Sequence, residues 1–200
     1  MPSLRTALAG AAVAASLLGV VASPASADSA RSSLTCRGEG VDPRAAVRYR
    51  ASTVVHASLG TVWRLQTDVE GWPSWQAAVG SAERLDGGVL RRGSAFHWTT
   101  PIPPNPATTA TGLDITSTVR QIRPGACIRW TGPAVADGLR IDGVHVWNVA
   151  EVDGGVLVGT EETHTGAQVD ADVPAATAIL RAGLDAWLHD LKAAAEAQDD

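Results

Sequence analysis

The sequence predicts an α+β domain, with an antiparallel sheet of about six to seven strands and one long C-terminal helix. Apolar and polar residues alternate over residues 47–55 and in several later segments, as they do in half-buried strands. Turn sequences rich in glycine separate these segments at 86–88, 123–125 and 153–155, which favours hairpins. The chain closes with a long amphipathic segment, 173–197, that is typical of a helix buried on one side.

The first 27 residues carry the features of a secretory signal peptide. Arg5 precedes an apolar run over residues 7–22, and a small-residue cleavage sequence, Ala-Ser-Ala, ends at Ala27. Cleavage after Ala27 would make Asp28 the new amino terminus. The run is shorter than the roughly 18 residues that argue for a membrane span. We therefore expect a secreted protein with no transmembrane segment in the mature chain.

Residues 28–46 are rich in Ser, Arg and Gly and show no sustained periodicity, so we expect an N-terminal extension there. The remaining 47–200 are enough for one domain with a substantial core and too few for two. Loss of Arg5 with the leader lowers the formal charge of the chain from -5 to -6. This acidic balance argues against nucleic acid or an anionic membrane as a partner, because both bind a basic face.

The two cysteines, Cys36 and Cys127, would both enter an oxidising compartment if the leader directs export. We predict that they form a disulfide joining the extension to a later strand. Closing a loop of roughly ninety residues would contribute about 4 kcal/mol on the chain-entropy description. The alternative is two free thiols, with Cys127 a small core residue.

The first strand begins at Val47, where apolar residues start to occupy every second position. A short helix should follow it, because Ser58 can cap the first turn and Gly71 is placed to end the helix. Trp72 and Trp75 mark a second short helix that should pack onto the sheet. The apolar stripe expected of the first helix consists of Leu59, Val62, Trp63 and Val69.

The proline-dense loop 101–106 either borders a cavity or is an ordinary surface loop. In the closing helix, Leu180, Leu184 and Trp187 are among the residues that share the apolar face. The later strands are expected over residues 77–85, 89–100, 110–121, 126–133, 139–152 and 156–166.

Five segments of the chain carry a likeness to a known family: 55–69 with Thr61-Val62-Trp63 at its core, EGWPSW at 70–75, GVHVW at 143–147, DGGVLVGTEE at 153–162 and LDAWLHDLKAAAE at 184–196. With the element order, they resemble the START-like helix-grip superfamily (SRPBCC), and within it the polyketide cyclase/dehydrase and lipid-transport family. The resemblance covers the chain from about residue 47 to its end. It implies a curved sheet that grips the long helix, with a cavity between them for an apolar or amphipathic ligand.

One pair of strands carries the residues most suited to acid–base chemistry. His145 and Trp147 alternate with two valines, so both should point to the same side of their strand. If that side lines the cavity, His145 can move a proton during an aldol-type ring closure, because an unperturbed histidine titrates near neutrality. On the next strand Glu162 and His164 share a face, and Glu162 can pair with His145 across the hairpin. The alternative is a packing histidine beside a core tryptophan, and the valines leave the facing of the strand open.

The sequence predicts neither a metal site nor a cofactor. The five histidines show no helical His-x-x-x-His spacing, and the chain has no paired-cysteine motif of the kind that zinc sites use. Its Gly-Gly pairs sit in hairpin turns and not between a strand and a helix, as phosphate-binding loops do.

We therefore expect an exported protein that binds or carries a hydrophobic small molecule, such as a lipid, polyketide or terpenoid-like compound. The alternative is a polyketide cyclase/dehydratase-like enzyme in which His145 and Glu162 transfer protons. A third possibility is a non-catalytic interaction module at the cell surface. The chain has seven tryptophans beside one Phe and one Tyr, and indoles offer large apolar walls. The expected ligand-binding residues are Trp63, Trp98, Trp130, His145, Trp147, Leu180 and Leu184.

Overall fold

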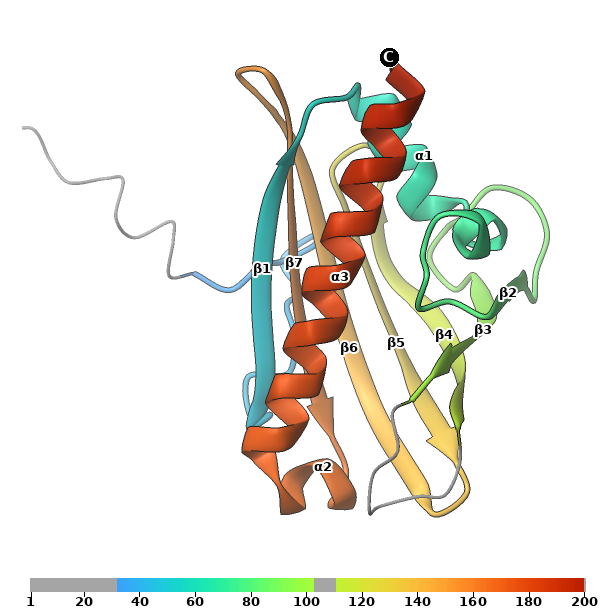
Figure 1. Ribbon diagram of the computed structural model, residues 1–200, viewed down its shortest axis with the longest axis vertical. Helices are drawn as coiled ribbons and strands as arrows, with labels where there is room; N and C mark the ends of the chain where they lie inside the picture. The colour runs from blue at the N-terminus through green and yellow to red at the C-terminus, as the bar shows by residue number, and fades with distance from the viewer. Residues whose placement is uncertain (1–31, 103–110, 200) are drawn as a thin grey trace, which may run out of the picture. The chain divides into compact units, whose positions relative to one another are not determined.

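The computed structural model describes residues 32–102 and 111–199, and its domain begins at Ser33. The predicted signal peptide over 1–27 and positions 103–106 of the proline-dense loop lie outside the described residues. Figure 1 shows the elements of the domain in chain order. They are β1 (Val47–Val55), α1 (Leu59–Thr67), the 3-10 helix η1 (Val69–Ser74), β2 (Ser81–Arg84), β3 (Ala95–Pro101), β4 (Gly112–Arg123), β5 (Cys127–Ala136), β6 (Leu139–Val152), β7 (Gly155–Thr165), α2 (Ala167–Ala171) and α3 (Val173–Asp199).

The seven strands form one antiparallel sheet in the order β1-β7-β6-β5-β4-β3-β2. The sheet curves, and α3 lies along its concave face over β1, β7 and β6, with α1 beside the C-terminal half of α3 (Figure 1). This arrangement confirms the α+β fold with a sheet around a long C-terminal helix. Within the described part of the chain, no helix combines the length and apolar character needed to cross a bilayer.

The junction between α1 and η1 differs from the expected helix end at Gly71. Ser58 caps α1 as expected, since its Oγ accepts a hydrogen bond from the backbone N–H of Thr61 at 3.1 Å. The helix ends four residues before Gly71, at Thr67, and Gly71 lies inside η1. The carboxylate of Asp68 folds back over that position, where a Cβ would meet its Oδ2 at 2.8 Å. Gly71 thus permits the turn between the two helices.

Two strands at the sheet edge are shorter than the alternation predicts. Segment 77–85 forms strand only as β2, and segment 89–100 only from Ala95 onward. The loop between them is closed by the carboxylate of Asp86, which accepts from Ser94 Oγ at 2.9 Å and pairs with Arg84 at 2.9 Å. These side-chain contacts replace ladder hydrogen bonds in the intervening segment.

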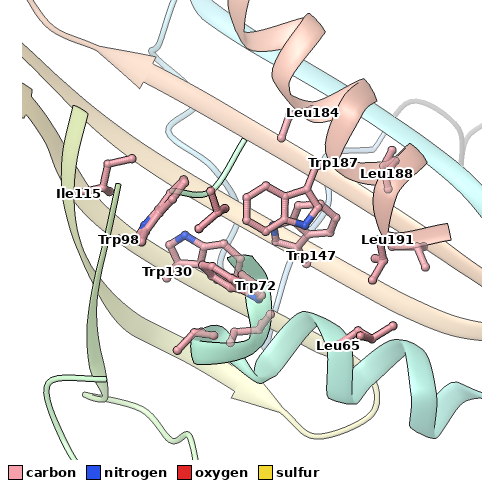
Figure 2. Close-up of a cluster of buried hydrophobic side chains, with 14 of the residues drawn as sticks. Leu65, Trp72, Trp98, Ile115, Trp130, Trp147, Leu184, Trp187, Leu188 and Leu191 are labelled. Atoms are coloured by element: carbon pink, nitrogen blue, oxygen red, sulfur yellow. The ribbon is translucent and has the colours of Figure 1, made fainter. Parts of the chain in front are cut away.

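Tryptophan side chains occupy the centre of the hydrophobic core. Trp72 of η1 is fully buried at its centre, and its ring meets Phe96, Trp98 and Trp187 edge to face at centroid distances of 5.4, 5.9 and 5.1 Å. Figure 2 shows Trp72 between indoles of the sheet and of α3, with Leu65 of α1 nearby. The expectation that Trp72 packs its helix onto the sheet is met by these contacts.

The N-terminal extension is fixed to the face of the sheet opposite α3. Cys36 and Cys127 form a disulfide with their Cα atoms 5.4 Å apart. Glu161 of β7 points to the same face and is 2% exposed. Its carboxylate accepts hydrogen bonds from Ser33 Oγ at 3.0 Å and from Arg48 Nε at 2.6 Å. The extension thus covers a buried acidic group as well as the disulfide.

Candidate functional site

A cavity of about 370 Å³ lies between α3 and the concave face of the sheet. Strands β3 to β7 and the first half of α3 supply most of its wall, and the wall is mainly apolar. A cavity of this size and character is typical of small-molecule sites. Figure 2 shows several of the side chains that line it. The lining residues labelled there are Trp98, Ile115, Trp130, Trp147, Leu184 and Trp187.

One end of the cavity is polar, because Glu162 meets two histidines there. Its Oε2 lies 2.8 Å from Nδ1 of His145, and its Oε1 lies 2.6 Å from Nε2 of His164. An ionised carboxylate only accepts hydrogen bonds, so each of these two ring nitrogens carries the hydrogen. In the neutral form of His145, Nε2 is then an acceptor.

Glu162 stays ionised although it is buried. Burial alone raises the pKa of this carboxyl, but the charge of His145 and the hydrogen bonds from His145 and His164 oppose it and lower the pKa to about 2. At neutral pH the cavity therefore contains a fixed negative charge held between two imidazole rings.

Strand register brings these groups together. In the antiparallel ladder Trp130 of β5 lies opposite His145 of β6, and His145 lies opposite Glu162 of β7. His145 also stacks on the indole of Trp130, with ring centroids 5.2 Å apart and planes inclined by 23°. The indole on one side and the carboxylate on the other hold the imidazole in one orientation.

Gly143 leaves the free nitrogen of His145 uncovered. This glycine lines the cavity two residues before His145, on the same face of β6. A Cβ at position 143 would come within 3.0 Å of His145 Nε2. Because glycine has no side chain, Nε2 faces open cavity space and can contact a bound molecule.

The indole nitrogens of the four tryptophans around the cavity differ in their hydrogen bonding. Trp187 Nε1 donates to Gln66 Oε1 at 3.2 Å, and Trp98 Nε1 donates to Ser117 Oγ at 3.2 Å. The Nε1 atoms of Trp130 and Trp147 are buried and have no hydrogen-bond partner within the described residues. Hydrogen bonds to the protein thus fix the rings of Trp98 and Trp187, whereas Trp130 and Trp147 present mainly apolar ring surface.

The structure brings most of the sequence-predicted site residues to this cavity. His145 and Glu162, the predicted acid–base pair, are in direct contact. Trp63 does not line the cavity; it lies on α1, half-buried against the edge of the core. The other expected ligand-binding residues all line the wall: Trp98, Trp130, His145, Trp147, Leu180 and Leu184.

Sequence reasoning missed the part that small residues play. Gly143 and, on α3, Ala182 and Gly183 line the cavity but carry no side chain that suggests chemistry. The alternation of β6 gives the one available signal, since Gly143 shares the face of His145. The alternation of β7 places His164 on the same face as Glu162, and the structure adds its direct contact with the carboxylate.

No metal-binding arrangement of three or more His, Cys, Asp or Glu side chains occurs in the described ranges 32–102 and 111–199. His145 and His164 approach different oxygens of Glu162 and use them as hydrogen-bond acceptors. The three side chains therefore form a carboxylate hydrogen-bonded by two histidines rather than a common set of metal ligands.

A curved antiparallel sheet around a long C-terminal helix, with an apolar cavity between them, defines a helix-grip fold. The chain belongs to the polyketide cyclase / dehydrase and lipid transport family, whose model matches residues 46–196. No curated protein matches the chain.

Solved structures share the fold at low sequence identity. A protein from Thermus thermophilus is 15% identical, with 76% of this chain and 99% of that chain covered and a TM-score of 0.61. A START superfamily protein from Mycobacterium smegmatis is 11% identical, with 76% and 98% covered and a TM-score of 0.58. The di-domain ARO/CYC StfQ from the steffimycin biosynthetic pathway is 16% identical, with 76% and 51% covered and a TM-score of 0.59. This chain thus matches about half of StfQ, and these likenesses concern the fold.

Proposed function

We propose that this protein binds or carries a hydrophobic small molecule, of lipid, polyketide or terpenoid type, in the cavity between α3 and the sheet. The observation that carries the proposal is a cavity of about 370 Å³ with mainly apolar walls and one polar end. Apolar walls favour an apolar guest by roughly 25 cal/mol for each Å² removed from water. The polar end orients such a guest without requiring a reaction.

The place of action that we propose is outside the cell. The predicted leader over 1–27 supports this, and so does the disulfide between Cys36 and Cys127, because disulfides persist in oxidising compartments. A carrier in that setting would keep a poorly soluble compound apart from water until it is delivered.

Tryptophan fluorescence tests the binding proposal. Delipidated and refolded protein should change its emission on titration with members of a panel of lipids, polyketides and terpenoids, because four indoles line the cavity: Trp98, Trp130, Trp147 and Trp187. Native mass spectrometry of protein purified without delipidation should show a bound mass that organic solvent removes. A panel without any response, together with no bound mass, would contradict the proposal.

A pair of variants on α3 locates the binding. Gly183 lines the cavity and has no heavy atom within 4 Å of a Cβ position, so Gly183→Trp should fold and obstruct the cavity. Ala186, one turn later, is exposed and does not line it, which makes Ala186→Trp the matched control. We expect Gly183→Trp to lower ligand affinity at least about tenfold and Ala186→Trp to leave it unchanged.

The contact between His145 and Glu162 favours a second candidate, a polyketide cyclase/dehydratase-like enzyme. The carboxylate orients the imidazole, and Nε2 faces the cavity, which is the arrangement of a general base. Nε2 would take a proton from a carbon between two carbonyl groups, and the resulting enolate would attack a carbonyl of the same chain. That carbonyl oxygen takes up a proton, and loss of water completes the dehydration. The cavity would contribute by holding the reacting carbons together.

Replacement of His145 separates the two candidates. In an enzyme, His145→Ala should abolish turnover of a poly-β-carbonyl substrate and leave the fold intact and binding measurable. The matched control is His189→Ala, because His189 on α3 has a side chain that is 81% exposed and outside the cavity. Turnover that survives in His145→Ala would rule out this mechanism and leave the carrier proposal in place.

A further inference from the structure

We infer that the cavity selects an uncharged molecule with a hydroxyl group and rejects the carboxylate that has the same hydrocarbon skeleton. The inference rests on the proposed function, since it assumes that a hydrophobic molecule occupies the cavity. It goes further by naming the polar group that the occupant must carry.

The charge of the cavity wall disfavours a carboxylate ligand. Among the described residues that line the cavity, Glu162 is the one acidic residue, and none is Lys or Arg. Arg181 on α3 does not line it; this guanidinium lies 5.5 Å from the centre of the Tyr49 ring and 3.6 Å from Asp185. A carboxylate ligand would therefore meet a second negative charge with no basic side chain of Lys or Arg to compensate it, and such burial is costly.

The two histidines do not remove this obstacle, because both are engaged by Glu162. His145 Nδ1 and His164 Nε2 each contact one oxygen of that carboxylate, at 2.8 and 2.6 Å. Both N–H groups therefore already donate hydrogen bonds to the ionised carboxylate of Glu162, which needs these donors because it is buried. A second carboxylate would have to compete with Glu162 for the same two rings.

The hydrogen bond that His145 offers through Nε2 favours a hydroxyl ligand. With Nδ1 donating to Glu162, Nε2 is the nitrogen that His145 leaves for a ligand; it accepts a hydrogen bond when the ring is neutral, and Gly143 places no side chain over it. An acceptor requires a donor on the ligand. A hydroxyl supplies one, whereas an ether or an ionised carboxylate does not.

Three ligands of equal chain length test the inference by isothermal titration calorimetry at pH 7.5. They are 1-dodecanol, its methyl ether and dodecanoate, each used below its aggregation concentration. We expect 1-dodecanol to bind at least about tenfold more tightly than dodecanoate, because the carboxylate brings an uncompensated charge. We expect it to bind about threefold more tightly than the ether, because the ether cannot donate the hydrogen bond to Nε2.

Glu162→Gln removes the charge and keeps the size of the side chain. In this variant the affinity for dodecanoate should rise, and the difference between alcohol and carboxylate should shrink to about threefold. Glu161→Gln is the matched control, because it makes the same change on the neighbouring residue, whose side chain points to the opposite face and contacts Arg48. Its ligand preference should equal that of the wild type.

The outcomes distinguish the two proposals. Dodecanoate binding to wild-type protein as tightly as 1-dodecanol would overturn the selectivity and leave the binding function standing. Binding of none of the three ligands, together with no response to the wider panel and no bound mass, would overturn the binding of a hydrophobic molecule and the selectivity with it. The wild-type comparison is decisive by itself, so the test does not depend on the stability of either variant.

Discussion

Gly143 occupies a position where one methyl group would change the site. A Cβ there would lie 3.0 Å from His145 Nε2, closer than carbon and nitrogen normally approach. Gly143→Ala should therefore rotate the imidazole away and weaken binding of a hydroxyl ligand by about threefold, the value of the one hydrogen bond to Nε2 that is lost. Titration calorimetry would give the affinity, and the NMR signals of the His145 ring would report its displacement.

Gly183→Ala is the control for this substitution. Gly183 also lines the cavity, but no heavy atom lies within 4 Å of its Cβ position. The new methyl group should favour the helix, because alanine costs less backbone entropy than glycine. An affinity that falls equally in both variants would show that added volume, and not the position of His145, is responsible.

Glu162 should make the fold sensitive to acid. The pKa of this carboxyl is about 2 in the folded protein against 4.5 for an unperturbed glutamate: burial raises it, but the two histidines more than offset that effect. Because the folded-state pKa is the lower one, the stabilisation is complete above about pH 4.5 and is lost as the pH falls towards 2. The shift corresponds to a free energy of unfolding on the order of 3 kcal/mol.

Urea unfolding of wild type and Glu162→Gln at pH 6 and pH 3 measures this contribution. The wild type should lose clearly more stability between these values than the variant. Asp86 and Glu196, whose pKa values are also lowered, by Arg84 and Lys192 in the main, are present in both proteins and cancel in the comparison. Equal pH dependence in the two proteins would show that Glu162 is not stabilised as an anion.

The residue types of the site were accessible from the sequence, but their contacts were not. Alternation placed His145 with Trp147 and Glu162 with His164, and the apolar valines beside His145 left either face of the strand possible. The facing was decided by tertiary structure, since α3 and the tryptophan core cover one side of the sheet. Glycine has no side chain that would suggest a function in the sequence. The role of Gly143 therefore follows only from its position next to the His145 ring in the structure.

At the scale of elements, the β6–β7 hairpin determines the site. His145 and Glu162 are paired in register and lie equally far from the turn at Asp153 and Gly154, where Gly154 has a φ of 80°. The sequence shows this turn as Asp-Gly-Gly, so the cross-strand pair could be predicted from counting alone. The same Asp-Gly-Gly sequence at 86–88 does not form the predicted tight hairpin turn: β2 ends at Arg84 and β3 begins only at Ala95, because the side-chain contacts of Asp86 organise a longer loop.

The N-terminal extension should stabilise the sheet mainly through its disulfide. Cys36 and Cys127 are 91 residues apart, and closing a loop of that length contributes about 4 to 5 kcal/mol on the chain-entropy description. We expect the Cys36→Ser/Cys127→Ser variant to lose stability of this order in urea unfolding. Ligand affinity at neutral pH should change little, because the extension lies on the face of the sheet opposite the cavity.

The reduced wild-type protein provides the control for the serine substitutions, since it lacks the bond but keeps both side-chain volumes. Its stability should match that of the double variant. A loss much below the expected value would indicate that the contacts of Glu161 with Ser33 and Arg48 hold the extension without the bond.

At the scale of the whole molecule, the tryptophans divide into three roles that composition does not reveal. Trp72 fills the centre of the core, Trp130 and Trp147 line the cavity, and Trp63 lies outside that lining. All were expected to face inward or to pack. A stripe of apolar residues predicts that a face is buried, but whether it meets protein or a cavity depends on the curvature of the sheet and the position of α3. The fold was therefore predictable, and the extent of the cavity was not.

Export of the chain from the cell should leave two marks on the mature protein. If residues 1–27 act as a signal peptide, the exported protein should begin at Asp28, and its two cysteines should resist alkylation without a reductant. Intact-mass analysis of the exported fraction would measure both properties at once. A version expressed from Asp28 without the leader in a reducing cytosol is the control, and it should contain two alkylatable thiols and unfold at lower urea concentration. Exported protein that retains Met1 would contradict cleavage of the leader. Protein found only inside the cell would contradict its role in export and leave the disulfide without the compartment that maintains it.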